Sequence, residues 1–367
     1  MSFRLSAEDI KIGILTVYKL NSVVITPISG KYSIYSSGEK IIDVKINTSI
    51  HLTILDNCII VSTDEKNYGA YNSIDFVSSG FLNYFTINST KYAKKEFSFD
   101  DDLNITVVNN CFKFINIVDL EHYIAGVVEA EGGRKASSEY YKVQAIICRT
   151  YAICHLNKHK SEGYEMCDLV HCQVYNGKCR NTDILMAASE TSGMVIVDER
   201  SKPINATYHS NCGGQTINSI DVWSINRSYL KPIVDKYCTS QPNARWERHC
   251  LKKAWLAYLG DKFNYPINDS GACNAALNFK QWTRKTYFLN DKDIPLSKIR
   301  NDWLFKSSYF SIYTKGDSVV FKGRGYGHGV GLCQEGAMKM AEEGIKFRDI
   351  IKTYYHNVKI VNYEEIK

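Results

Sequence analysis

One glutamate has a setting that suits acid catalysis. Glu131 ends a predicted amphipathic helix that Asp119 would cap, and it falls on the apolar stripe of that helix with Leu120 and Ile124. Partial burial and the negative end of the helix both disfavour a charged carboxylate. A carboxylic acid that stays protonated near neutral pH can act as a general acid. The same pattern also fits an ordinary capping or salt-bridged glutamate.

Cysteine and histidine residues gather farther along the chain. Cys167, His171 and Cys172 lie close together, and His159 precedes them. Thiolate and imidazole groups suit tetrahedral zinc, and two of each would close a structural site. The spacing matches no standard zinc finger. The alternatives are a disulfide that involves Cys167, Cys172 or Cys179, buried thiols, or a catalytic zinc with an open position.

Two loops could offer polar groups to a ligand. The segment His209–Gln215 follows a predicted strand, and its Ser210 lacks the glycine elbow of a hydrolase nucleophile, so we expect binding rather than attack. The segment Gly323–Gly331 alternates glycine with other residues, which would let the backbone approach a ligand and present Tyr326 and His328. It is neither a Walker loop nor a dinucleotide fingerprint, so no organic cofactor is expected. A purely structural turn is the alternative.

The elements that must position these residues are mixed. Up to about Phe99, β-branched segments separated by turn residues predict strands. The acidic run Asp100–Asp102 marks a break after this strand-rich part. Farther on, the patterns predict both element types: helices near 119–132, 138–159, 252–259, 333–343 and 347–355, and strands near 194–197, 204–209 and 318–321. The predicted fold class is therefore α+β. A strand-rich N-terminal domain would cover residues 1–105, and a mixed domain residues 106–367.

The composition is that of a folded globular protein. The 367 residues are 44% hydrophobic and 23% charged, and the net charge of +6 is spread along the chain. No Lys/Arg run occurs, so no nucleic-acid partner is expected. No apolar stretch is long enough to span a bilayer. Residues 1–10 lack the pattern of a signal peptide, so we expect either a cytoplasmic protein or a chain that begins after a removed export signal.

Five motifs, read in order, resemble those of the stage II sporulation protein D family. They are Leu120–Glu131, Lys142–Ala152, Cys167–Tyr175, His209–Gly214 and Gly325–Gly331. The chain departs from the family where Ala130-Glu131-Gly132 replaces Ser-Glu-Met or Ala-Glu-Met, and where Asn243-Ala244 precedes the Arg-Trp pair. Residues 1–105 carry no such motif and look like an accessory domain, so residues 106–367 would be the catalytic domain.

The resemblance implies a peptidoglycan lytic transglycosylase. Such an enzyme cuts the MurNAc-β-1,4-GlcNAc bond of glycan strands stripped of stem peptides. The family glutamate falls on Glu131 as general acid and base, and the family arginine falls on Arg149. The sugar's own 6-hydroxyl attacks the anomeric carbon, which leaves a 1,6-anhydroMurNAc end and explains why one carboxyl replaces the usual two.

The resemblance also implies ligands, partners and a location. Substrate contacts fall on five residues: Ser210, Gln215, Arg245, Tyr326 and His328. A structural Zn²⁺ would be held by four: His159, Cys167, His171 and Cys172. The partners would be peptidoglycan glycan strands and a cell-wall amidase. The location would be extracytoplasmic, in the periplasm or cell envelope.

Two other functions compete with this one. Some relatives are described as amidase enhancers, which bind the wall or a partner amidase without cutting, and a pure enhancer has no need of a partly buried acid at Glu131. A zinc hydrolase would need an open metal position, which closed Cys₂His₂ ligation would not provide. We rank the transglycosylase first, the enhancer second and the zinc hydrolase third.

Overall fold

The computed structural model describes residues 9–89, 96–133 and 135–367. Its contacts divide the chain into two compact units, residues 1–195 (unit 1) and 196–367 (unit 2). Both units combine helices and strands, which confirms the predicted α+β class. This division is one of packing, and the domain boundary expected at 105/106 stays a prediction. Residues 1–8, which belong to the segment searched for a signal peptide, lie outside the described residues.

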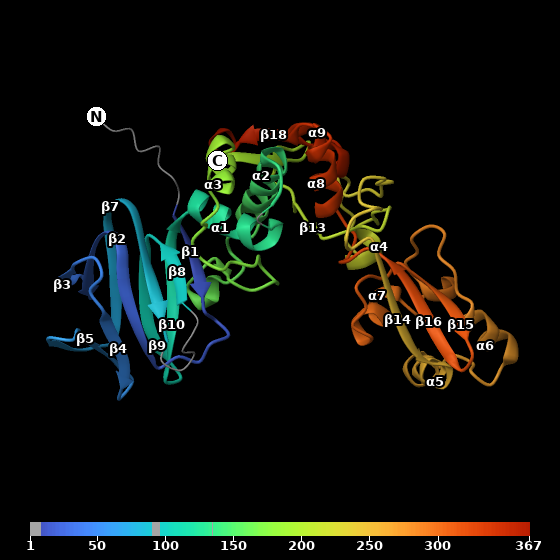
Figure 1. Ribbon diagram of the computed structural model, residues 1–367, viewed down its shortest axis with the longest axis horizontal. Coiled ribbons are helices and arrows are strands. Elements are labelled where there is room, and N and C mark those ends of the chain that lie inside the picture. Colours follow the sequence, from blue (N-terminus) through green and yellow to red (C-terminus); the bar gives the residue numbers. More distant parts are fainter. Residues whose placement is uncertain (1–8, 90–95, 134) are drawn as a thin grey trace. The chain divides into compact units, whose positions relative to one another are not determined.

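Unit 1 is built on a largely antiparallel sheet. In the described part of the chain it has eleven strands, in the order β11-β1-β10-β9-β7-β2-β4-β5-β6, with β3 paired to β2 and β8 to β7 (Figure 1). The strands are β1 (Asp9–Ile14), β2 (Ser22–Ser36), β3 (Glu39–Val44), β4 (Ile50–Leu55), β5 (Cys58–Ser62), β6 (Asn67–Tyr71), β7 (Ser73–Asn88), β8 (Glu96–Asp100), β9 (Asp102–Val108), β10 (Cys111–Asp119) and β11 (Met166–Cys167). The strand-rich character of the N-terminal segment is thus confirmed.

One of the β-branched segments of the N-terminal part is divided into two strands in the structure. The segment 51–61 forms β4 and β5, which pair with each other in antiparallel fashion. Asp56 and Asn57 between them both have positive φ, the conformation of a tight hairpin turn. The β-branched residues on either side hid this turn from the sequence pattern.

Three α-helices complete the described part of unit 1, and they pack together. They are α1 (Leu120–Gly132), α2 (Ser138–Cys154) and α3 (Thr182–Glu190). The Asp119 side chain caps α1, as predicted, and Gly133 ends it. Helix α2 stops before the predicted residue 159. The His155 ring bonds the Tyr151 carbonyl, the acceptor that the next helical turn would need.

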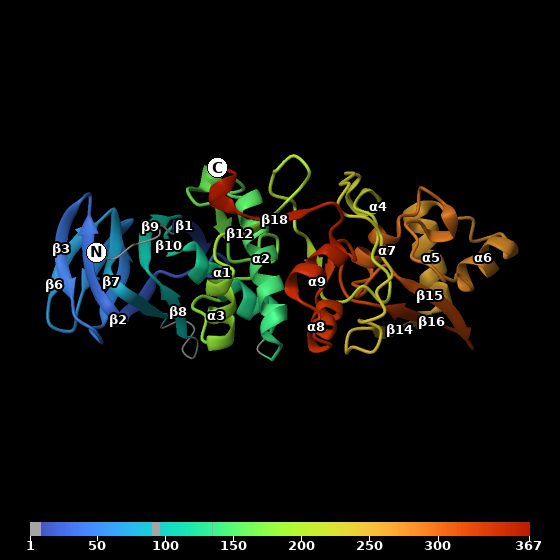
Figure 2. The same cartoon turned by 90° about the horizontal axis from the view of Figure 1, so that it is seen from above.

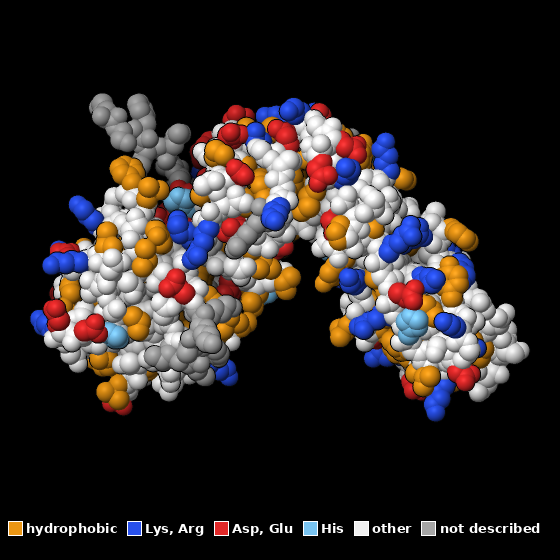
Figure 3. Space-filling view, in the orientation of Figure 1, with side chains coloured by type: hydrophobic (Ala, Val, Ile, Leu, Met, Phe, Trp, Pro, Cys, Tyr) orange, Lys and Arg blue, Asp and Glu red, His pale blue; other side chains and the backbone are white. Residues whose placement is uncertain are grey.

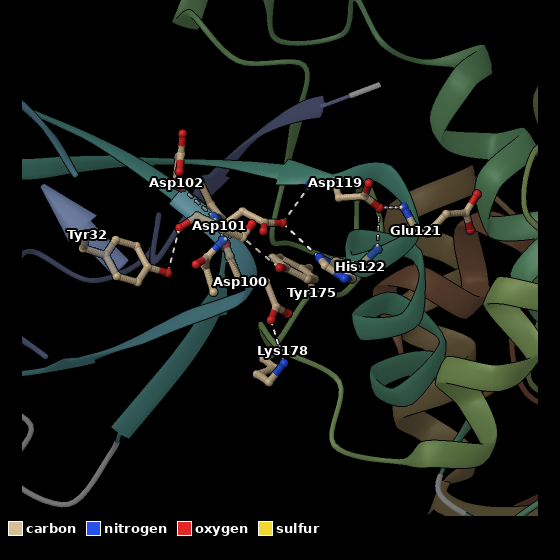
Figure 4. Close-up of polar contacts among 12 residues, drawn as sticks. Tyr32, Asp100, Asp101, Asp102, Asp119, Glu121, His122, Tyr175 and Lys178 are labelled. Atoms are coloured by element: carbon tan, nitrogen blue, oxygen red, sulfur yellow. Dashed lines mark hydrogen bonds and ion pairs between the residues drawn. The ribbon is translucent and has the colours of Figure 1, made fainter. Parts of the chain in front are cut away.

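Two sets of contacts join the sheet to the helical part of unit 1. Strand β11 pairs with β1 in parallel, with Gly13 opposite Cys167. At the start of α1, the Asp101 carboxylate accepts the Asp119 backbone N–H at 3.1 Å and lies 3.0 Å from Nδ1 of His122 (Figure 4). Asp101 raises the pKa of His122 to about 9, against the smaller effect of burial. A charged His122 therefore ties the sheet to the helix.

Unit 2 has its own aromatic core around a three-stranded sheet, β14-β16-β15, on which α5 and α6 pack (Figure 2). Trp255, Phe310 and Phe321 lie at the centre of that core. The elements from residue 194 on are β12 (Met194–Val197), β13 (Tyr208–His209), α4 (Ile220–Trp223), β14 (Arg245–Leu251), α5 (Lys252–Phe263), α6 (Ser270–Leu277), α7 (Leu296–Asp302), β15 (Phe310–Lys315), β16 (Ser318–Arg324), β17 (Leu332–Cys333), α8 (Gln334–Glu342), α9 (Phe347–Tyr354) and β18 (Lys359–Asn362).

Most predicted elements of unit 2 are present, but the strand expected at 204–209 is shortened to β13. The Asn205 backbone N–H donates to the Tyr229 hydroxyl instead of to another strand. On the face shown in Figure 3, Lys and Arg side chains are interspersed with Asp and Glu. None of the described helices combines the length and apolar character that crossing a bilayer requires.

Candidate functional site

The Glu131 carboxyl is partly buried and accepts a hydrogen bond from the backbone. It lies in the last turn of α1, and its Oε1 accepts the backbone N–H of Val174 at 2.9 Å. Glu129, two residues earlier, faces elsewhere and accepts the Arg180 backbone N–H at 3.1 Å. The two glutamates of this helix end therefore have separate environments.

The predicted zinc ligands of unit 1 come together. One ligand atom each of His159, Cys167, His171 and Cys172 lies within 4.8 Å of the others. The Nε2 atom of His159 is 3.3 Å from the Cys172 Sγ, and the Nε2 atom of His171 is 3.2 Å from the Cys167 Sγ. Two thiols and two imidazoles at such distances fit a tetrahedral ion of the zinc type.

A carboxylate supports this cluster from outside. Glu162 lies 2.5 Å from Nδ1 of His159, so it would direct the opposite nitrogen, Nε2, toward the other ligands. Carboxylate partners of this kind commonly orient histidines that bind a metal. Burial lowers the pKa of His171, which favours the neutral imidazole that a metal needs.

The cluster and Glu131 share one segment of backbone. Val174, which bonds Glu131, lies two residues after Cys172. The intervening Gln173 is buried, accepts from the Tyr123 hydroxyl and donates to the Cys148 carbonyl, so it is fixed between α1 and α2. At Gly126 of α1, a Cβ would lie only 2.3 Å from the Gly177 carbonyl oxygen. This close packing makes the Glu131 orientation depend on the Cys/His segment.

Arg149 lies with Glu121, near the opposite end of α1 from Glu131. Its side chain is 0% exposed, and its guanidinium forms a bidentate ion pair with the Glu121 carboxylate. In this pair the distance from Nε of Arg149 to Oε1 of Glu121 is 2.8 Å. It also donates to the Met194 and Ala188 carbonyls. These contacts favour a positioning role, in which Arg149 connects α1 and α2 to the end of α3, over direct contact with substrate.

The two candidate loops of unit 2 pack on each other. Asn211 and Tyr326 exchange backbone hydrogen bonds of 3.0 and 2.8 Å. A Cβ at Gly325 would lie 2.5 Å from the Asn211 carbonyl oxygen, and the other glycines from Gly323 to Gly331 also meet protein atoms closely. Neighbouring protein atoms thus occupy the position of a Cβ at each of these glycines, which accounts for glycine there, and the approach of a ligand to this loop stays a prediction.

Arg284 holds these loops together, and no sequence motif marked it. Its guanidinium donates to the carbonyls of Cys212, Gln215 and His328, each at 3.2 Å. Burial lowers the Arg284 pKa to about 10. A Cβ at Gly329 would lie 2.0 Å from Nη1 of Arg284, so only glycine fits there without a shift.

The predicted substrate contacts differ in accessibility. Tyr326 is 43% exposed. Burial, helped by Arg300 and Arg284, lowers the His328 pKa to about 4, so its ring is neutral at pH 7. Nδ1 of that ring accepts the Val330 backbone N–H, which makes His328 part of the loop structure. The half-buried Ser210 accepts the Glu335 backbone N–H through its carbonyl.

Gln215 and Arg245 line open cavities on unit 2. Two cavities of about 580 and 430 Å³ share Arg245, Trp282 and Arg324 in their walls, and Gln215 lines the smaller one. Trp282 is 85% exposed, which is unusual for so large an apolar side chain. A flat indole beside arginines suits a polar ligand that has apolar faces, as a sugar has.

The fold and geometry define an α+β protein that carries a Cys/His cluster beside the glutamate at the end of a helix. Residues 108–197 match the family described as "Stage II sporulation protein". This match confirms the resemblance to the stage II sporulation protein D family that was seen in the motifs. The matched residues include Glu131 and the Cys/His cluster but end before the loops of unit 2.

Similar proteins extend the match beyond this domain. The chain is 25% identical over 361 residues to an uncharacterized protein of Brachyspira hyodysenteriae, covering 94% of this chain and 93% of that one. It is 26% identical to "Stage II sporulation protein D" of Bacillus subtilis over 294 residues, 75% of this chain and 84% of that one. It is also 26% identical to the B. subtilis "Amidase enhancer" over 294 residues, 65% of this chain and 40% of that one.

Proposed function

We propose that this protein is a peptidoglycan lytic transglycosylase that cleaves the MurNAc-β-1,4-GlcNAc bond of peptide-stripped glycan strands. The observation that carries the proposal is the setting of Glu131, which is partly buried at the end of α1 and oriented by the Val174 N–H at 2.9 Å. The family domain around it supports this assignment. Because peptidoglycan lies outside the cytoplasmic membrane, the proposal includes an extracytoplasmic location.

The proposed reaction needs one carboxyl group. A backbone N–H can only donate, so Oε1 of Glu131 serves as an acceptor and the acid proton would lie on Oε2. Glu131 gives this proton to the glycosidic oxygen as the bond to the anomeric carbon breaks. The 6-hydroxyl of the same MurNAc then attacks that carbon and returns its proton to Glu131. The products are a 1,6-anhydro end and a free 4-hydroxyl, and no water is consumed.

Zinc would have a structural part in this proposal. His159, Cys167, His171 and Cys172 would hold Zn²⁺ with four protein ligands, which supplies rigidity and leaves no open position for catalysis. The ion would fix the segment that leads from Cys172 to Val174, and through it the Glu131 carboxyl. The closed ligand set also disfavours a zinc hydrolase.

The test compares Glu131→Gln with Glu129→Gln on purified glycan strands without stem peptides. Gln at position 131 keeps an acceptor for the Val174 N–H but cannot donate the acid proton. We expect the unmodified protein and Glu129→Gln to release products one water lighter than hydrolysis products, by mass spectrometry. Glu131→Gln should release none while it retains its fold by circular dichroism. Equal activity of both variants would remove Glu131 from the mechanism.

A second candidate is a non-catalytic amidase enhancer, favoured by the similarity to the B. subtilis protein of that name. The same digestion separates the two functions. An enhancer would bind glycan strands without cutting them and would raise the rate of an added cell-wall amidase. Under that outcome Glu131→Gln would enhance the amidase as well as the unmodified protein does.

A further inference from the structure

Four ligand-type side chains meet inside unit 2, and the proposed reaction uses none of them. Cys212, Asp235, Cys238 and Cys333 are all buried, and one ligand atom of each lies within 4.8 Å of the others. They come from three separate segments. Cys212 follows β13, Asp235 and Cys238 precede β14, and Cys333 ends β17 and caps α8 through its side chain.

The separations fit ligands that share one ion. The Cys212 Sγ lies 3.4 Å from the Cys238 Sγ and 3.4 Å from Oδ2 of Asp235. A tetrahedral zinc with ordinary bond lengths would set two sulfurs about 3.8 Å apart, and a sulfur and an oxygen about 3.5 Å apart. A disulfide needs only about 2.05 Å between sulfurs, and it would leave the third thiol and the carboxyl unexplained.

The buried Asp235 carboxyl has no cationic partner among the described residues. Asp235 is 2% exposed, and its oxygens accept from the Tyr237 backbone N–H and the Tyr354 hydroxyl, both at 2.9 Å. No Lys, Arg or His of the described ranges forms an ion pair with it. Buried carboxylates are normally paired or bound to a metal.

Backbone N–H groups donate to two of the three sulfurs, those of Cys333 and Cys238. The Cys333 Sγ accepts backbone N–H groups from Cys212 at 3.2 Å and from Gly336 at 3.4 Å, and the Cys238 Sγ accepts that of Gly214 at 3.2 Å. Such donors would stabilise the charge of sulfurs bound to a metal ion. Cys333 also lies at the positive end of α8.

We propose that Cys212, Asp235, Cys238 and Cys333 form a second, independent structural site for a divalent soft metal, with Zn²⁺ as the expected ion. Three thiolates and one carboxylate suit zinc, and four protein ligands leave no open position. The ion would cross-link the loop after β13, the loop before β14 and the start of α8. Because Asn211 pairs with Tyr326, the ion would also stabilise the glycine-rich loop.

The test counts metal ions per chain in the full-length protein after zinc loading under reducing conditions and removal of free zinc. Native mass spectrometry compares the unmodified protein with Cys333→Ser and with the control Cys250→Ser, a half-buried cysteine outside both clusters. We expect Cys333→Ser to bind one ion fewer than the unmodified protein, and Cys250→Ser to bind the same number. Full metal content in a folded Cys333→Ser would overturn the proposal.

A complementary variant keeps the test decisive if Cys333→Ser does not fold. His171→Ala/Cys172→Ser disables the cluster of unit 1, and we expect it to retain one ion. Loss of all metal from this variant would overturn the second site, as would a Cys212–Cys238 disulfide in peptide maps of the protein under the same conditions. Failure of glycan cleavage would leave these counts unchanged, so the proposal and the enzymatic function fail separately.

Discussion

Replacing Arg149 by methionine should destabilise unit 1 strongly, because the guanidinium is fully buried and paired with Glu121. Breaking a buried ion pair from one side costs about 3–5 kcal/mol. The Glu121 side chain is 21% exposed and also accepts from the Ser192 hydroxyl and the Gly193 N–H, so it is not left without donors. We therefore expect the low end, about 3 kcal/mol. With a urea m value of about 2 kcal/mol/M, the midpoint should fall by about 1.5 M.

Urea unfolding followed by circular dichroism measures this shift, and glycan digestion of the folded variant measures activity. The double variant Arg149→Met/Glu121→Leu should recover part of the loss, because it removes both charges. An unchanged midpoint together with abolished cleavage would refute the reasoning and make Arg149 a direct participant in the reaction. Activity that falls only as far as the folded fraction falls would support the positioning role.

Three other perturbations test separate parts of the structure. The pKa of His122 is about 9 in the folded protein against an ordinary 6.5, so its pairing with Asp101 contributes stability that is complete below pH 6.5 and lost as the pH rises through 9. Because the side chain is 36% exposed and its charge is screened, we expect this loss to be about 1–2 kcal/mol. The loss should appear as a fall in the urea midpoint, and His122→Gln should abolish this pH dependence. Gly329→Ala should lower the free energy of unfolding by about 1–3 kcal/mol more than Gly344→Ala does, as measured by thermal unfolding. Both glycines have positive φ, but only at position 329 would a Cβ meet a guanidinium, so equal losses would contradict the packing argument. Trp282→Ala should weaken glycan binding about tenfold in pull-down titrations. The control Leu304→Ala, which changes another exposed apolar side chain, should leave binding unchanged. Unchanged binding by both variants would exclude the cavities of unit 2 as a glycan surface.

Local signals allowed the sequence to predict much of the fold. Asp119 caps α1, as expected from its residue type, and helix 347–354 follows its apolar spacing. The close grouping of Cys167, His171 and Cys172 likewise made their cluster predictable. Such features depend on neighbours in the chain, which is why one sequence suffices to find them.

Features that depend on distant segments were not predictable in this way. The partner of Arg149 is Glu121, because the packing of α2 on α1 decides which carboxylate the guanidinium meets. Arg284 belongs to no motif, yet it bonds three loop carbonyls. The cysteines of the second cluster have no regular spacing, because three separate loops bring them together.

The parallel pairing of β1 with β11 limits how the gene can be shortened. Cys167 lies opposite Gly13, and the Asp168 carboxylate accepts the Leu15 backbone N–H at 2.6 Å, so the first strand of the chain supports the Cys/His segment. A fragment that starts at residue 106 would begin inside β9 and would lack β1 altogether. Any minimal fragment for crystallography or engineering must therefore keep β1, and a natural recombination event that exchanged the first hundred residues would have to supply an equivalent strand in the same register.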